Sequence, residues 1–311
     1  MNVFLWHVHG SWTTAFVQGR HRYLLPVVPE RGLEGRGRAD TWDWPSSAVE
    51  LDRALATDAP VDVLIVQRPE ELDLAMEWLG GRRPGRDVAV LYLEHNAPRA
   101  HAATTRHPAA DRDDLVVVHV THFNDLFWDC GTTRTVVIEH GIVDPGYRFS
   151  GELPRVAAVI NEPVRRARVA GTDLLEPLSR AVPLDLFGMG SAPLGGVDDL
   201  VQDKLHDELA RRRAYVHPFR WTSLGLTLIE AMHLGMPVVA VAATDVVEAV
   251  PPGTGVISTD IERLGDAIAE FAHDVDTARA TGRRARAYAL RRYGLGRFLS
   301  DWDALLEEVA A

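Results

Sequence analysis

The stretch from Ala214 to Val241 carries the residues whose types and spacing most clearly predict chemistry. An apolar run ends at the turn Ser223-Leu224-Gly225, and a helical pattern follows before a second apolar run. A glycine in such a turn lets backbone approach a ligand closely, and the unpaired N–H groups of a helix start favour an anion. Ser223 adds a hydroxyl that can cap the helix or bind a phosphate oxygen. The turn is therefore a predicted anion site.

Glu230 lies about two turns into this helix, at about 3.6 residues per turn. A carboxylate there can accept paired hydrogen bonds from vicinal hydroxyls, such as those of a ribose. The neighbouring Leu226, Ile229 and Met232 are apolar. A buried carboxylate with partners and a solvated helix residue are therefore about equally expected.

Two other loops of the second half directly follow predicted strands. One holds Arg165, Arg166 and Arg168, whose guanidinium groups suit a diphosphate, although three arginines in a loop are equally well explained as surface charge. The other holds a Gly-x-Gly turn, Gly188 and Gly190, which allows backbone to approach a nucleotide; a plain tight turn gives the same pattern. The complete dinucleotide fingerprint is absent, so NAD binding is not predicted.

Histidines stand at the ends of predicted strands in the first half. His9 precedes Gly10 and Ser11, His95 follows another strand, and His140 ends the last one. We favour His95 for chemistry, because its loop is expected to face the ligand site. No His and Cys spacing matches a zinc site, and the Asp-x-Asp pattern at residues 111–113 precedes a strand rather than following one. We therefore expect no metal site.

Composition limits the class of protein. With 311 residues and a net charge of −11, the chain favours two domains and argues against wholesale nucleic-acid binding. Solvated helix faces best explain its arginine clusters, and peripheral contact with an anionic membrane is the alternative. The lone Cys130 excludes a disulfide framework, and packing is a better explanation for it than catalysis. The sequence shows neither a signal peptide nor an apolar run of ~20 residues, so we expect a cytoplasmic protein.

Short apolar runs alternate with helical patterns along the chain, which predicts parallel sheets covered by helices on both faces. Two successive sets of runs predict an α/β fold with two doubly wound, Rossmann-like domains facing across a cleft. The expected linker is the segment 143–153, which contains proline and glycine. The predicted strands are 3–8, 61–66, 88–93, 115–120 and 135–138, then 156–160, 184–188, 214–219, 238–241 and 255–257.

The region 215–255 resembles the nucleotide-sugar-binding core of the retaining GT-B glycosyltransferases of group 1, also called family four. That class typically has the pattern P-S-x-x-E-G-F-G-L-x-x-x-E-A-M-x-x-G-x-P-V-V-A. This chain has HPFRWTSLGL at 217–226, EAM at 230–232 and GMPVVA at 235–240. Weaker similarity to the inter-domain segment of the class extends over residues 138–145.

The resemblance implies roles by position. Glu230 corresponds to the carboxylate that binds the donor ribose, and Leu224 and Gly225 correspond to backbone donors to the diphosphate. Thr222 stands where the class has a first glutamate, which usually holds the donor sugar. The resemblance further implies Arg165 or Arg168 for the basic phosphate-binding pair and His95 near the transferred sugar. From their place in turns and at strand ends we add Gly188, Gly190 and Ser223 on the donor side, and His9, Gly10 and Ser11 on the acceptor side.

The resemblance also implies an activity and a domain plan. The expected domains are an acceptor-side domain 1–150, a nucleotide-sugar-binding domain 151–296, and a C-terminal helix 297–311 that packs back on the rest of the protein. The implied reaction moves a sugar from a nucleotide diphosphate sugar to a small-molecule, glycan or lipid-linked acceptor with retention, and it needs no metal and no further cofactor. The helix start and an arginine would stabilise the departing diphosphate, and His95 would support the sugar.

Two other functions stay open. Thr222 motivates a non-catalytic sugar-nucleotide or glycan-binding protein on a transferase scaffold. A GT-B epimerase or phosphorylase is less favoured, because phosphorylase chemistry needs pyridoxal phosphate on a lysine. The only lysine, Lys204, lies in a polar helical stretch.

Overall fold

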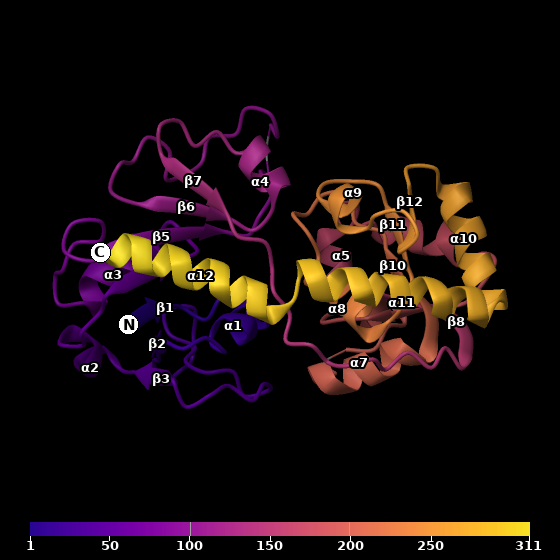
Figure 1. Cartoon of the computed structure of the whole chain (residues 1–311), viewed down its shortest axis with the longest axis horizontal. Helices are drawn as coiled ribbons and strands as arrows, with labels where there is room; N and C mark the ends of the chain where they lie inside the picture. The colour runs from indigo at the N-terminus through magenta and orange to yellow at the C-terminus, as the bar shows by residue number, and fades with distance from the viewer. Residues whose placement is uncertain (100, 199) are drawn as a thin grey trace. The chain divides into compact units, whose positions relative to one another are not determined.

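Two parallel sheets, one in each half of the chain, organise the structure (Figure 1). The structure is a computed structural model that describes residues 1–99, 101–198 and 200–311. Unit 1 comprises Met1–Val143 and Leu295–Ala311, and unit 2 comprises Asp144–Gly294. The α/β class predicted from the alternating apolar runs is confirmed.

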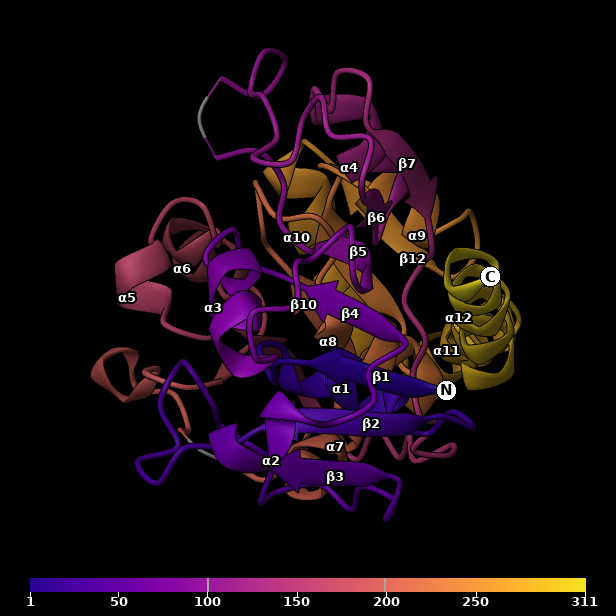
Figure 2. The same ribbon diagram turned by 90° about the vertical axis from the view of Figure 1, so that its left-hand side faces the viewer.

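The described part of unit 1 has a seven-stranded parallel sheet in the order β3-β2-β1-β4-β5-β6-β7. Figure 2 shows β4 between β1 and β5. Because consecutive strands extend the sheet one way from β1 and the other way from β4, the order reverses between these two strands. The strands are β1 (Asn2–Leu5), β2 (Arg22–Pro26), β3 (Ala48–Leu51), β4 (Val63–Val66), β5 (Ala89–Glu94), β6 (Val116–His119) and β7 (Arg134–Val137). The helices are α1 (Gly10–Phe16), α2 (Arg53–Thr57), α3 (Glu71–Trp78), α4 (His122–Phe127) and α12 (Leu295–Ala310).

The sequence prediction missed β2 and β3. Pro26 ends β2 and a further proline follows shortly, which masks a short apolar run. β3 has four residues, and its two central ones are only half-buried. Their pairing, with Tyr23 opposite Ala48, is therefore a product of tertiary contact rather than of a strong local pattern.

Unit 2 has a five-stranded parallel sheet in the order β12-β11-β10-β8-β9 among its described residues. All the strands predicted for this half occur: β11 is buried throughout, whereas β12 is half-buried along its length and β9 includes Asp185. The order reverses between β8 and β10. The strands are β8 (Leu153–Val159), β9 (Leu184–Phe187), β10 (Arg212–His217), β11 (Val238–Val241) and β12 (Gly255–Ser258). The α-helices are α5 (Pro163–Arg166), α6 (Leu175–Leu178), α7 (Gln202–Arg211), α8 (Leu226–Leu234), α9 (Val246–Ala249), α10 (Ile261–His273) and α11 (Val275–Arg292), with short 3₁₀ turns at Thr172–Leu174 and Ala192–Leu194.

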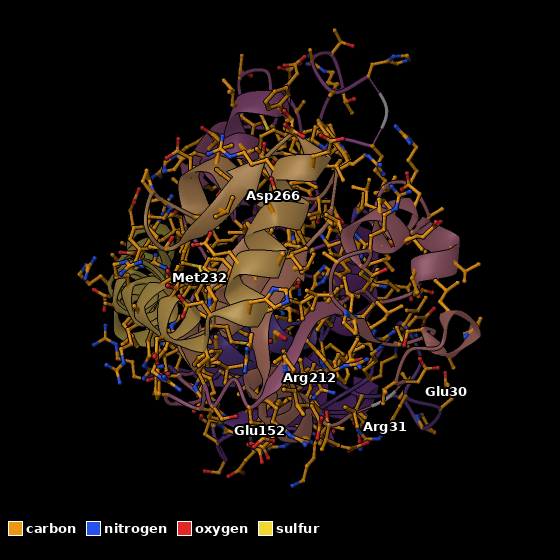
Figure 3. All side chains as sticks on the ribbon, turned by 90° about the vertical axis from the view of Figure 1, so that its right-hand side faces the viewer. Glu30, Arg31, Glu152, Arg212, Met232 and Asp266 are labelled. Atoms are coloured by element: carbon orange, nitrogen blue, oxygen red, sulfur yellow. The ribbon has the colours of Figure 1, made fainter. Side chains whose placement is uncertain are left out.

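An ion pair links β10, an inner strand of unit 2, to the edge strand β9. Arg212, labelled in Figure 3, lies at the start of β10 and places its Nε 2.9 Å from an oxygen of Asp185 on β9.

The predicted linker is, from Asp144 onward, part of unit 2. Its backbone N–H at Phe149 donates to the carbonyl of Leu234 over 3.0 Å, and Arg286 of α11 binds both carboxylate oxygens of Asp144 at 2.7 Å. This segment is therefore anchored along its length.

The final helix, α12, belongs to unit 1 although the helix before it belongs to unit 2. Its buried residues are Phe298, Trp302, Leu305 and Leu306, the apolar face expected from the sequence. The Trp302 ring lies 5.5 Å from that of Trp12 and 5.0 Å from that of Phe16, both on α1. No helix in the described residues combines the length and apolarity that crossing a membrane would require.

Replacing Trp302 by alanine is predicted to destabilise unit 1 by about 3–5 kcal/mol, the usual cost of removing a buried tryptophan. Urea unfolding followed by circular dichroism measures this loss. Ser300→Ala on the exposed face of the same helix is the control and should change stability by less than about 0.5 kcal/mol. Equal effects of the two substitutions would contradict the assignment of α12 to the core of unit 1.

Candidate functional site

The point of strand reversal in unit 2 brings two of the predicted segments together. At such a point the loops after neighbouring strands run in opposite directions, which leaves room for a ligand at the carboxyl ends. The loop after β8 holds the predicted arginines, and the loop after β10 holds the predicted anion-binding turn. The expected co-location of these segments therefore follows from the strand order.

The start of α8 has the form expected of an anion site. Gly225 is its N-cap, no side chain of the described residues caps it, and the helix has nine residues. The N–H of Leu228 donates to the carbonyl oxygen of Gly225 over 3.0 Å, so the N–H groups before it at the helix start are the ones without an intrahelical acceptor. Position 225 requires glycine, because the ring of His217 packs against its backbone and a Cβ there would lie only 2.5 Å from Cε1 of that ring. Ser223 and Leu224 are buried beside it, and Thr222 is half-buried.

A stack of three side chains flanks this helix start. The ring of His217, at the end of β10, lies 4.5 Å from that of Phe219 at 23°, and the guanidinium carbon of Arg166 lies 5.0 Å from the Phe219 ring centre. Burial lowers the pKa of His217 to about 3, so its imidazole is neutral at physiological pH. Its Nε2 has no hydrogen-bond partner within the described residues.

The three arginines predicted for phosphate binding lie in different surroundings. Arg165 is exposed and pairs with Glu162, and Arg168 is exposed and lies 3.2 Å from Asp173. Only Arg166 of the three stacks over Phe219 in the described structure. The structure therefore favours Arg166 over Arg165 and Arg168 as the basic residue of the site. The sequence named all three but had no signal for this choice, which depends on the short helix α5.

Glu230 is buried, with only 3% of its surface exposed. Its Oε1 accepts a hydrogen bond from Nε2 of Gln202 over 2.8 Å, and its Oε2 lies 3.4 Å from Nε2 of His206. Of the two alternatives left by the sequence, the buried carboxylate with partners is therefore the one observed. Sequence reasoning missed both partners, although their i, i+4 spacing places them on one face of α7.

The Gly-x-Gly turn after β9 connects to the loop after β8. Gly188 and Gly190 have φ of 122° and 73°, values that strongly favour glycine. A Cβ on Gly188 would lie 2.6 Å from the carbonyl oxygen of Ile160. The side-chain oxygen of Asn161 also accepts from the N–H of Met189 over 3.0 Å. The tight turn, one of the two predicted alternatives, thus accounts for both glycines and places their backbone beside the arginine loop.

In unit 1 three histidines gather at the carboxyl ends of the strands. The rings of His9 and His95 are 4.0 Å apart, and those of His95 and His140 are 6.2 Å apart and nearly parallel. Burial lowers the pKa of His9 to about 4 and that of His140 to about 3, and it also lowers the pKa of His95. The cluster is therefore a group of neutral imidazoles that can exchange hydrogen bonds with hydroxyl groups.

The other predicted residues of unit 1 adjoin this cluster. Gly10 and Ser11 begin α1 directly after His9, and the ring of Trp42 occupies the space where a Cβ of Gly10 would lie. Cys130 is buried, its Sγ lies 3.6 Å from Nε2 of His119, and burial raises its pKa to about 11, as expected of a packing residue. No group of three or more His, Cys, Asp or Glu in the described residues is arranged to hold a metal ion.

Comparison with known proteins finds a family match within unit 2. Residues 199–288 match the family model of the glycosyl transferases group 1. The match includes α7, α8 and Glu230, so the carboxylate and its two partners lie inside the family region. No curated protein sequence matches the chain.

Solved structures extend the similarity to the whole fold. Sucrose-phosphate synthase from Thermosynechococcus elongatus has a TM-score of 0.76 at 14% identity, covering 99% of this chain and 98% of that one. HepE from Anabaena, in complex with UDP, has a TM-score of 0.70 at 15% identity, covering 99% of each chain. TarM from S. aureus has a TM-score of 0.57 at 13% identity, covering 78% of this chain and 55% of that one. The chain therefore has the GT-B glycosyltransferase fold and spans about half of TarM.

The buried histidines predict a specific acid sensitivity. The imidazole of His140 takes up a proton near pH 6.5 when unfolded but only near pH 3 when folded, so the free energy of unfolding falls as pH drops below about 6.5. We expect His140→Gln to reduce this slope by ~1.4 kcal/mol per pH unit, measured by urea unfolding between pH 6.5 and 5. His122→Gln, an exposed histidine, is the control. An unchanged slope in His140→Gln would show that His140 is charged in the folded protein.

Proposed function

We propose that this chain is a retaining glycosyltransferase that moves a sugar from a nucleotide diphosphate sugar to an acceptor hydroxyl without a metal ion. The observation that carries the proposal is the Arg166–Phe219–His217 stack beside the uncapped start of α8. In the reaction the bond between the sugar anomeric carbon and the diphosphate breaks, and negative charge develops on the leaving diphosphate. A guanidinium and a helix start stabilise that charge, so the protein itself supplies what a metal would otherwise provide.

Glu230 supplies the second part of the donor site. A carboxylate offers about four acceptor positions, and Gln202 and His206 use two of them. The remaining positions suit the two vicinal hydroxyls of a ribose. In this role Glu230 is held in place by α7 and acts as neither acid nor base.

Related structures guide the choice of donor. HepE was solved with UDP, with UDP and glucose, and with UDP-glucose, and pneumococcal GtfA was solved with UDP and GlcNAc. These complexes support testing UDP-sugars first. The acceptor side is assigned to His9, Gly10 and Ser11, and His95, whose ring lies 4.0 Å from that of His9, is assigned to the transferred sugar. Retention is supported by the resemblance of residues 215–255 to the retaining class.

The test is incubation with UDP-, GDP- and ADP-sugars and a panel of acceptors, with nucleotide release as the readout. NMR of the product gives the anomeric configuration, and excess EDTA tests metal independence. Inversion or loss of activity in EDTA would overturn those two parts of the proposal. Nucleotide binding in calorimetry without turnover on any pair would instead favour the non-catalytic binding protein, which Thr222 motivates.

Glu230→Gln is predicted to raise the donor KM about tenfold to a hundredfold, because it replaces charged hydrogen bonds to the ribose that are worth about 1.5–3 kcal/mol. The amide has nearly the same shape, so the fold should persist. Glu262→Gln, on the exposed start of α10, is the matched control and should leave the KM unchanged. Unaltered donor affinity in Glu230→Gln would refute the ribose role.

Arg166→Ala is predicted to lower kcat/KM about tenfold to a hundredfold, because it removes a positive charge beside the leaving diphosphate. Arg168→Ala is the comparison, and its loss should be several-fold smaller, since that side chain is exposed and paired with Asp173. Steady-state kinetics with the active donor measure both. A larger loss in Arg168→Ala would reverse the choice between the two arginines.

A further inference from the structure

The side chain that holds His95 in unit 1 is Gln67, which follows β4 directly. Nε2 of His95 lies 3.0 Å from Oε1 of Gln67. The backbone of this segment is fixed, because the N–H of Gln67 donates over 2.6 Å to a carboxylate oxygen of Glu71, which is fully buried. The other oxygen of Glu71 accepts from Nε of Arg68 over 2.7 Å. Gln67 is therefore a rigid neighbour of His95.

The orientation of the Gln67 amide follows from its second contact. Its Nε2 donates to the backbone carbonyl oxygen of Trp6 over 2.8 Å. A carbonyl oxygen only accepts, so the amide nitrogen must face Trp6 and the amide oxygen must face His95. That amide oxygen also only accepts. The proton shared with Gln67 therefore belongs to Nε2 of His95.

The consequence is a defined tautomer. A neutral imidazole with its proton on Nε2 has a lone pair on Nδ1. His95 makes no second hydrogen bond within the described residues, and its ring is enclosed by His9, His140 and Trp12. Burial and the two neighbouring imidazoles lower the pKa of His95 well below its usual value, which keeps the ring neutral.

The position of this pair fits a ligand site. Trp6 and His9 follow β1, Gln67 follows β4, and the strand order of unit 1 reverses between these two strands. We propose that Gln67 is a positioning residue that keeps His95 in the Nε2–H form, so that Nδ1 accepts a hydrogen bond from a sugar hydroxyl. This inference rests on the proposed glycosyltransferase function.

Nitrogen-15 NMR of histidine side chains in the full chain tests the tautomer directly. The His95 signals, assigned by their absence in His95→Asn, are expected to show a protonated Nε2 and an unprotonated Nδ1. Gln67→Leu should shift His95 to a mixture of tautomers, because it removes the acceptor that faces Nε2. Gln18→Leu, a glutamine beyond the end of α1, is the control and should leave the spectrum unchanged. A protonated Nδ1 in the native chain, or an unaltered spectrum in Gln67→Leu, would overturn the proposal.

Kinetics separate positioning from general damage. Gln67→Leu is expected to lower kcat about tenfold, since one hydrogen bond to the substrate is weakened, while the affinity for UDP, assigned to unit 2, stays within twofold. A loss of kcat and UDP affinity together would indicate a structural effect and refute the positioning role. If the native chain transfers no sugar from any donor, the proposed function fails, whereas the NMR result still decides whether Gln67 fixes His95.

Discussion

The reversal of strand order in each parallel sheet is the constraint on which both candidate sites depend. In a doubly wound sheet the loops at the carboxyl ends diverge only where consecutive strands begin to extend the sheet in the opposite direction. In unit 1 this point lies between β1 and β4, and in unit 2 it lies between β8 and β10. His9 and Gln67 flank the first point, and Arg166 and His217 flank the second. The reversal makes β1 a neighbour of β4 and β8 a neighbour of β10, and the residues of each site follow these neighbouring strands.

The electrostatics of the two sites are local rather than global. The chain as a whole carries a charge of −11, which repels an anionic donor. The histidines at both sites are buried and have lowered pKa values, so they add polarity without charge. The positive potential at the unit 2 site therefore comes from Arg166 and from the start of α8. These two sources act at short range, which suits stabilisation of charge on a bound diphosphate.

Both proposed polar functions depend on a glutamine that supports another side chain. Gln202 donates to Glu230 in unit 2, and Gln67 accepts from His95 in unit 1. A buried carboxylate or imidazole without partners is costly, so each must be bound internally before a ligand arrives. The amide leaves part of the hydrogen-bonding capacity of its neighbour unused. The same contact thus stabilises the folded protein and orients the group for a substrate.

The sequence by itself determined the fold class, the strands of unit 2 and the place of the turn that precedes α8. These depend on local patterns, namely continuous apolar runs, a glycine at a helix start and the residues 230–240 that resemble group 1 glycosyltransferases. β2 and β3 escaped prediction, because short strands with proline or half-buried residues form only against their neighbours. Whether Glu230 is solvated or buried was also undecided, since its partners lie on a different helix, α7.

The tertiary structure alone decided which side chains meet. Arg165, Arg166 and Arg168 are chemically equal in the sequence, and the turn of α5 brings only Arg166 onto Phe219 in the described chain. His9, His95 and His140 are separated by many residues, and the parallel sheet places their strand ends together. Local pattern fixes what kind of residue each loop carries, whereas contact depends on strand order and helix direction, which are set by packing over the whole unit.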